Sequence, residues 1–293
     1  MWKKGILLVV MFLLLLTGCR TPVEPVAPPS FTLETYPKVD GSTVTIPMSE
    51  ALVSKLLKLP LEEARLYVLH NKTHEAYLNL MAKKADVIFV TSPSAEELDL
   101  AKKAGVELEV IPVVSEGFVF LVGADNPVNS LTKKQIVEIY SGKITNWKEV
   151  GGKDEPILAY QRPVNSGSQT GFLDLVMKDV TPMEAPTTQV VAGMGELIDA
   201  VAAFEDQPGG IGYSYFYYTT SMWKNEKVKL ISIEGVAPSK ESIASSKYPY
   251  RTAYYAVVRK DEPKESNARK LVAYILSKEG QNLMEEAGYV KVK

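Results

Sequence analysis

Short apolar runs alternate with amphipathic stretches along the chain between residues 43 and 287. Asp86–Val90 and Phe118–Val122 are nearly continuous apolar runs, which is the pattern of strands that are buried on both faces. His74–Lys84 instead carries its apolar residues three and four positions apart, as a helix with one buried face does. The alternation is typical of an α/β protein with largely parallel sheets. We expect strands at 43–46, 65–69, 86–90, 118–122, 157–160, 210–213 and 254–258, and helices at 47–57, 74–84, 95–104, 133–140, 171–177, 196–204 and 268–287.

The first 19 residues form a segment of a different kind. Two lysines precede an apolar run at residues 5–16, which is too short to span a bilayer comfortably. The run ends in Leu16-Thr-Gly-Cys19 and resembles a bacterial lipobox, so we expect a lipoprotein signal peptide at residues 1–18 and a lipid on Cys19. Cys19 is the only cysteine, which excludes an internal disulfide. The alternative is a transmembrane helix that ends at a buried cysteine.

Residues 19–35 are rich in proline and show no hydrophobic period, so they are expected to form an extended, lipidated tether. The body that follows, residues 36–293, is long for one compact unit and short for three, which favours two lobes. Loss of residues 1–18 would remove two of the 33 basic residues and none of the 35 acidic ones, for a net charge of −4. The body shows no basic patch, so nucleic acid is not expected as a partner. The lipid would anchor the body to the cell membrane on its extracytoplasmic side, and which membrane this is stays open where a cell has two.

The segment from Tyr160 to Gly171 concentrates groups that bind oxyanions. Arg162 can offer a planar fork of N–H donors to two oxygens, and its charge does not titrate away near neutral pH. Ser166 and Ser168 add hydroxyls, and Gly167 lets the backbone come close to a ligand. The apolar run that follows predicts a helix whose free N–H groups point toward the same oxygens. The alternative is an ordinary polar loop in which Ser166 caps that helix.

Four turns between predicted strands and helices carry short hydroxyl side chains. Ligands of open α/β sheets bind beyond the carboxyl ends of strands, where such turns lead into helix N-termini. A buried tetrahedral oxyanion needs several N–H and O–H donors. We therefore expect the turns to form one oxyanion site, although serine and threonine are also common helix caps. The turns are Asp40–Val44, Asn71–Thr73, Thr91–Ser94 and Asn165–Ser168.

Several motifs, in order along the chain, resemble the phosphate-binding lipoproteins of bacterial ABC transporters. The stretch Gly142-Lys-Ile-Thr-Asn-Trp147, followed by the Arg162 loop, is specific to that family. The resemblance implies a two-lobed type II periplasmic-binding-protein fold of the α/β class with two hinge crossings. Lobe 1 would take residues 36–112 and 235–293, lobe 2 residues 117–232, and the crossings would lie near 112–117 and 218–233. The other motifs are Asp40-Gly-Ser-Thr-Val-Thr-Ile-Pro47, Thr73-His-Glu-Ala-Tyr77, Asn126-Pro-Val, Leu131-Thr, Gly210-Ile-Gly-Tyr-Ser214 and Gly288-Tyr289.

The same resemblance implies a set of phosphate-binding residues. Thr43 and the backbone N–H of Val44 match the first loop of the family, and Ser42 lies close by. Thr73 falls at the second loop, where the family places a hydroxyl. The remaining matches lie after the third predicted strand and in the arginine loop, and they are Thr91, Ser92, Arg162, Ser166, Gly167 and Ser168.

Thr91-Ser92-Pro93 departs from the family pattern. Many members place an aspartate there, which accepts the proton of hydrogen phosphate and rejects fully ionised sulfate. A site built from hydroxyls alone lacks that rejection. The sequence therefore favours phosphate and leaves sulfate, arsenate and phosphoesters open.

Other chemistries are less well supported. His70 and His74, with Glu75 beside them, suggest a zinc site, but the order His-Glu-x-x-His is absent and no metal is expected. The aromatic run Tyr213–Tyr218 is expected to pack at the lobe interface rather than to stack on a sugar or base. Gly167–Gly171 is not Gly-x-Ser-x-Gly, and no Walker or dinucleotide pattern occurs. We therefore expect neither an enzyme nor a cofactor.

Taken together, these features predict a membrane-tethered receptor that captures phosphate or a similar oxyanion between two lobes and delivers it to ABC permease subunits. Ligand binding should favour the closed arrangement, because donors from both lobes meet only there. The alternative, from a different class, is a surface lipoprotein that uses the same fold as an adhesin or as a structural or sensory partner.

Overall fold

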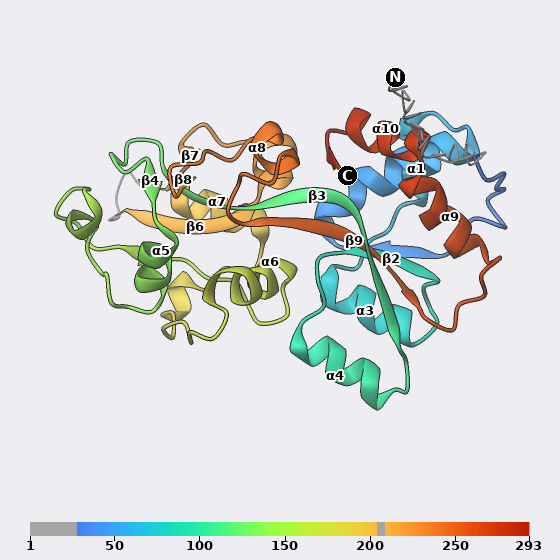
Figure 1. Ribbon diagram of the computed structural model, residues 1–293, viewed down its shortest axis with the longest axis horizontal. Coiled ribbons are helices and arrows are strands. Elements are labelled where there is room, and N and C mark those ends of the chain that lie inside the picture. The colour runs from blue at the N-terminus through green and yellow to red at the C-terminus, as the bar shows by residue number, and fades with distance from the viewer. Residues whose placement is uncertain (1–27, 204–208, 293) are drawn as a thin grey trace, which may run out of the picture.

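The computed structural model describes residues 28–203 and 209–292, which form two α/β lobes side by side (Figure 1). The expected signal peptide and Cys19 lie outside the described residues. Within the described ranges, no helix is both long and apolar enough to cross a membrane. The strands are β1 Val39–Gly41, β2 Val87–Val90, β3 Leu108–Gly123, β4 Ser130–Leu131, β5 Leu158–Ala159, β6 Gly210–Tyr215, β7 Val228–Leu230, β8 Ser232–Ile233, β9 Arg251–Arg259 and β10 Val290–Lys291.

Helices cover the sheet in both lobes (Figure 1). The α-helices are α1 Ile46–Leu57, α2 Leu61–Ala64, α3 Thr73–Met81, α4 Ala95–Lys103, α5 Lys133–Tyr140, α6 Gly167–Gly171, α7 Met194–Ala202, α8 Lys240–Ala244, α9 Asn267–Leu276 and α10 Lys278–Glu286. The 3-10 helices are η1 Thr43–Thr45, η2 Arg65–Tyr67, η3 Trp147–Val150 and η5 Thr187–Gln189, and the π-helices are η4 Phe172–Met177 and η7 Tyr218–Met222.

Two long strands, β3 and β9, run from one lobe into the other (Figure 1). They pair antiparallel from Leu108 opposite Arg259 to Gly117 opposite Arg251. Beyond this stretch β3 continues into the second lobe, where Phe118 pairs with Tyr215 of β6. The strand order β1-β2-β9-β3-β6-β5 is therefore continuous across both lobes. The predicted α/β alternation is confirmed, but the expectation of largely parallel sheets is wrong. The strand β3 crosses from the first lobe to the second and β9 crosses back, so the two central strands run antiparallel.

The return crossing comes later than the sequence suggested. Residues 228–230 form β7 and pair with the second-lobe end of β3, and β8 pairs with β4. The segment before β9 also stays beside this end of β3, since the Tyr248 hydroxyl donates to the carbonyl of Phe118 at 3.1 Å. The expected crossing at 218–233 is thus wrong, because the chain returns to the first lobe along β9. The second lobe therefore extends to about residue 251, and not to residue 232 as expected.

Two segments expected to be strands are helical. Residues 43–46 form η1 and the first residue of α1, because β1 ends at Gly41 and the Thr45 hydroxyl donates to the carbonyl of Phe89 at 2.6 Å. Residues 65–67 form η2, in which Arg65 pairs with Glu62 at 2.8 Å. This turn leaves apolar side chains in solvent instead of burying them in a sheet.

The end of the expected tether packs against the body. The ring of Phe31 is buried and meets the ring of Tyr36 edge-on, with 5.5 Å between centroids. Asn267 on α9 donates from Nδ2 to the carbonyl of Thr35 at 2.7 Å. Residues 31–35, which the sequence assigned to the tether, therefore pack as part of the body.

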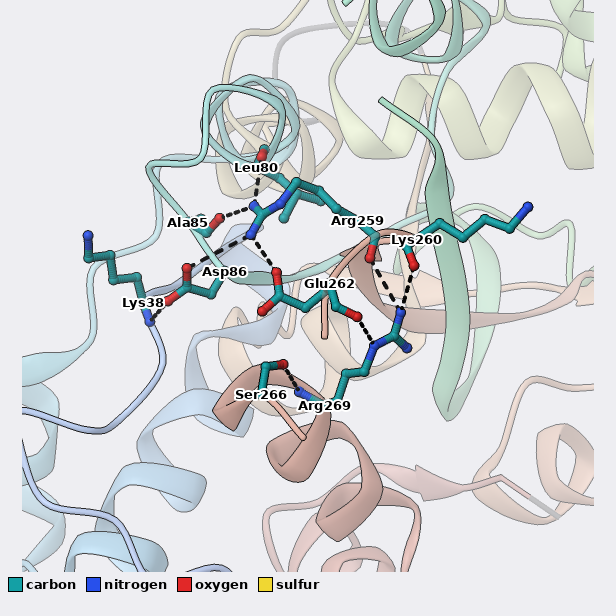
Figure 2. A network of polar contacts seen from close by, with 9 residues as sticks. All are labelled: Lys38, Leu80, Ala85, Asp86, Arg259, Lys260, Glu262, Ser266 and Arg269. Atoms are coloured by element: carbon teal, nitrogen blue, oxygen red, sulfur yellow. Dashed lines mark hydrogen bonds and ion pairs between the residues drawn. The ribbon is translucent and has the colours of Figure 1, made fainter. Parts of the chain in front are cut away.

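A polar network fixes the end of β9 in the first lobe (Figure 2). Arg259 is 6% exposed, and its Nη1 donates to the carbonyls of Leu80 and Ala85 at 3.0 and 2.7 Å. Its Nη2 donates to Oε2 of Glu262 at 2.6 Å, while Arg269 donates from Nε to the Glu262 carbonyl at 2.8 Å. Because every buried donor named here has an acceptor, the network holds the crossing strand without leaving an unpaired charge.

Candidate functional site

A cavity of about 510 Å³ lies between the two lobes. The first lobe lines it with the loop before α1, the start of α3 and the end of β2. The second lobe lines it with residues 162–168, the start of α7, Tyr215, Tyr218 and Trp223. Turns that lead from strands into helix N-termini therefore face each other across the cavity, which is where free backbone N–H groups favour an anion.

The first-lobe wall contains all the expected residues of that lobe except one. The expected residues that line it are Ser42, Thr43, Val44, Thr73 and Thr91. Ser92 does not line the cavity, although it was expected to belong to the site. Its neighbour Thr91 has the inward position instead, and the Thr91 side chain is buried.

Asp40 holds the two first-lobe loops together. Its Oδ1 accepts from the backbone N–H of Gly41 at 2.6 Å and of Asn71 at 2.7 Å. Its Oδ2 accepts from the side-chain amides of Asn71 and Asn79 at 2.9 and 2.8 Å. In the sequence Asp40 stood out only as part of a motif. Its bonds to Asn71 and Asn79, which are 31 and 39 positions away, show that it positions the two loops.

The two histidines serve the same lobe in different places. His70 lies behind the first loop, with Nδ1 2.9 Å from the carbonyl of Ser42 and Nε2 3.0 Å from the hydroxyl of Ser49. Burial lowers the pKa of His70, so it stays neutral near pH 7. His74 lines the cavity and contacts buried Glu97 at 3.1 Å. Among residues 28–203 and 209–292, no three histidine, cysteine or acidic side chains are grouped to hold a metal ion.

The second-lobe wall carries the expected arginine loop, and its donors lack partners. Nε and Nη1 of Arg162 are buried and make no hydrogen bond in the described part of the chain. The hydroxyls of Ser168 and Thr91 are unpaired in the same way, although both residues line the cavity. Burial lowers the pKa of Arg162, but not far enough to remove its charge. A buried donor without an acceptor costs free energy, and an acceptor inside the cavity would remove that cost.

Tyr213 and Gln169 position the arginine loop. The backbone N–H of Arg162 donates to Oε1 of Gln169 and to the hydroxyl of Tyr213, both at 3.0 Å, and the Tyr213 hydroxyl also donates to Gln169. The ring of Tyr213 stacks on Phe172 with 4.6 Å between centroids. The sequence analysis expected the aromatic run that begins at Tyr213 to pack at the lobe interface. It gave no role to Gln169, whose partners are set by the tertiary fold.

The arginine loop touches the first lobe directly. A Cβ atom added to Gly167 would lie 2.5 Å from Oγ1 of Thr91 and 2.6 Å from Oγ1 of Thr73, so only glycine fits there. The Tyr215 hydroxyl donates to the Gly167 carbonyl at 2.9 Å. Ser166 has two roles, because it lines the cavity and also accepts from the backbone N–H of Gln169 as the cap of α6. The two interpretations of this loop, helix cap and ligand cradle, are therefore compatible.

Comparison with known proteins assigns the family. The family model described as the PBP superfamily domain matches residues 36–279. The chain belongs to the PBP superfamily. A structure of a phosphate ABC transporter substrate-binding protein from Clostridium perfringens, solved with bound phosphate, is similar at a TM-score of 0.68 and 27% identity, over 87% of this chain and 98% of that one. An ABC-type phosphate transport receptor from Vibrio cholerae is similar at a TM-score of 0.65 and 24% identity, over 87% and 99% of the two chains. The two-lobed type II fold of this superfamily is thus confirmed.

Curated relatives within the PBP superfamily match over shorter spans. The phosphate-binding protein PstS of Bacillus subtilis is 31% identical over 195 residues, which is 65% of this chain and 61% of that protein. PstS of Borreliella burgdorferi is 27% identical over 183 residues, or 61% of this chain and 64% of that protein. The chain therefore spans less than two thirds of the length of either relative.

Proposed function

We propose that this chain is an extracytoplasmic binding protein that captures phosphate between its two lobes and delivers it to an ABC permease. The observation that carries the proposal is the set of buried, unpaired donors around the cavity: Nε and Nη1 of Arg162, the Ser168 hydroxyl and the Thr91 hydroxyl. They come from both lobes, so one oxyanion would satisfy both walls at once. The names of the matched relatives, which describe phosphate binding, agree with this chemistry.

The charge of the site suits a dianion. Arg162 supplies a fixed positive charge with two free N–H groups, and charge-assisted hydrogen bonds of this kind contribute roughly 1.5 to 3 kcal/mol each. The helix N-termini at Thr43, Thr73 and Gly167 add partial positive charge and backbone N–H donors. We propose Ser42, Thr43, Val44, Thr73, Thr91, Arg162, Ser166, Gly167 and Ser168 as the phosphate-binding residues.

The same arrangement favours binding over catalysis. Among the described residues that line the cavity, no serine or threonine hydroxyl is hydrogen-bonded to a histidine or a carboxylate that could act as its base. We therefore propose a non-enzymatic role, with a lipid on Cys19 holding the protein at the outer side of the cell membrane. No observation favours the adhesin alternative.

Isothermal titration calorimetry with phosphate and with sulfate tests the proposal. Phosphate should bind with 1:1 stoichiometry. Absence of binding to either ion would refute the oxyanion mechanism. Equal affinity for both ions would instead show that a site whose side-chain donors are hydroxyls and Arg162 does not select phosphate over sulfate.

A further inference from the structure

The cavity is larger than a bare tetrahedral oxyanion requires. Its volume is about 510 Å³, whereas four oxygens fill on the order of 100 Å³ if each takes about the 30 Å³ of a water molecule. We propose that the site also accepts phosphomonoesters whose compact, uncharged or cationic substituent lies against an apolar wall of the second lobe. This inference rests on the proposed function, because it places the phosphoryl group on the donors around Arg162.

The extra volume is not a gap that simple closure would remove. The two lobes already touch beside the unpaired donors, since Gly167 approaches the hydroxyls of Thr73 and Thr91 too closely for any Cβ atom. Asn165 also donates from Nδ2 to Oε2 of Glu96 across the lobes at 2.6 Å. A rotation that pressed the lobes further together here would make these atoms overlap. These contacts limit how far closure could reduce the space beside the arginine loop.

An apolar wall borders that space. It consists of four residues of the second lobe, Val164, Met194, Tyr218 and Trp223, all of which line the cavity. Val164 is 76% exposed and Trp223 is 43% exposed. A bare ion would gain nothing from these side chains, whereas each Å² of apolar surface covered by an organic group contributes about 25 cal/mol. The wall therefore fits a ligand with an organic substituent better than it fits a free ion.

Trp223 is held in place as part of this wall. Its Nε1 donates to Oδ1 of Asp199 at 3.1 Å. Its ring lies over Gly195, where an added Cβ would come within 2.7 Å of two ring atoms. Because the ring is fixed before a ligand arrives, contact with it costs little conformational entropy.

Charged residues around the cavity limit the substituent. The exposed carboxylates of Glu75 and Glu196 line it together with one exposed lysine, Lys72. Arg162 also lines the cavity, but it would pair with the phosphoryl group. The charges left for a substituent are then two negative and one positive, which disfavours a second anionic group on the ligand. A neutral or cationic substituent meets no such penalty.

Calorimetric titration of the full chain with inorganic phosphate and with phenyl phosphate tests the inference. We expect phenyl phosphate to bind at least as tightly as phosphate, and Trp223→Ala to weaken phenyl phosphate about tenfold while changing phosphate less than about twofold. Phosphate binding without phenyl phosphate binding would overturn the inference and leave the proposed function intact. An equal loss of both ligands in Trp223→Ala would also overturn it. If neither ligand binds, the proposed function itself fails.

A second variant covers the case in which Trp223→Ala does not fold. Val164→Ser changes a side chain that is 76% exposed and should weaken only phenyl phosphate, by about two- to threefold. Leu66→Ser is the matched control, because Leu66 is 82% exposed and does not line the cavity. An equal effect of both substitutions on phenyl phosphate would contradict the apolar wall.

Discussion

Asn165 in the second lobe donates a hydrogen bond from Nδ2 to Oε2 of Glu96 in the first lobe, at 2.6 Å. Asn165 has φ +62°, in the left-handed region that asparagine tolerates better than most residues. Glu96 lies in the first turn of α4, where the helix dipole favours a carboxylate. The bond joins the lobes beside the cavity, which Asn165 lines, and stabilises the arrangement in which the arginine loop meets the first lobe.

Asn165→Gly should speed ligand release. Glycine keeps the left-handed backbone and removes only the hydrogen bond. An exposed bond of this kind contributes about 0.5 to 1 kcal/mol, so the phosphate dissociation rate should rise by about two- to fivefold. Stopped-flow release of phosphate measures the rate. An unchanged rate would show that the contact does not help to hold the lobes together.

Gly167→Ala should weaken phosphate binding without harming the fold. Alanine is acceptable at the start of a helix, but its Cβ would overlap the hydroxyls of Thr73 and Thr91. The lobes would have to separate, which takes donors of one wall out of reach of the ligand. We expect a loss of affinity of about tenfold or more, measured by calorimetry. As a control, the ligand-free variant should unfold thermally near the wild-type temperature. If the variant bound phosphate with wild-type affinity, the close contact would be contradicted.

Tyr215 links the hinge strands to the cavity. Its ring packs edge-on against Phe118 of β3 and at an angle against Tyr254 of β9, each at 5.4 Å between centroids. Its hydroxyl donates to the Gly167 carbonyl. Tyr215→Phe removes this bond and should lower phosphate affinity, measured by calorimetry, by about fivefold, which corresponds to about 1 kcal/mol.

Tyr274→Phe is the matched control for that substitution. The Tyr274 hydroxyl is buried on α9 without a partner in the described part of the chain, so its loss should leave phosphate affinity unchanged and should not lower stability. The interpretation of Tyr215 would be wrong if the two variants bound phosphate equally well.

Glu116 should make folding stability depend on pH. Its carboxylate is buried beside the crossing, where Oε1 accepts from the backbone N–H of Gly117 at 2.7 Å and of Tyr217 at 3.3 Å. Burial raises the pKa of Glu116 to about 7 from an ordinary value of 4.5. Between these two values the folded chain binds more protons than the unfolded chain, so this group's contribution to stability falls as the pH rises and is lost above about pH 7.

Glu116→Gln removes this dependence and keeps an acceptor for both N–H groups. The free energy of unfolding of the variant, relative to wild type, should rise by up to about 3 kcal/mol between pH 4.5 and pH 7 and then stay level. Urea unfolding at a series of pH values measures the difference. A constant difference across this range would mean that Glu116 does not titrate there.

Residues that act within one turn could be predicted from the sequence. Thr43, Thr73, Thr91, Arg162 and Gly167 each lie in a short loop with its own chemical pattern, and all five line one cavity. The sequence could not show that Thr91 lines the cavity and that Ser92 does not. Successive residues at the end of a strand point to opposite sides, and the sequence does not say which side faces the ligand.

Residues that act through distant contacts could not be predicted. Tyr215 meets Gly167 across 48 positions and Asn165 meets Glu96 across 69, and neither pair leaves a local signal. The length of β3 was missed for a related reason. Residues 108–117 include Pro112 and Glu116, which interrupt the apolar pattern, and only pairing with β9 makes the whole segment a strand.

The calorimetric affinity of Arg162→Ala for phosphate tests the central claim most directly. This substitution removes both unpaired guanidinium donors and the positive charge, so affinity should fall by about a hundredfold or more. Ser92→Ala, in the neighbouring loop but outside the cavity lining, should stay within about twofold of wild type. Loss in Arg162→Ala with retention in Ser92→Ala is the predicted result. Wild-type affinity in Arg162→Ala would contradict the account, because the ligand would then not lie on the donors of this cavity.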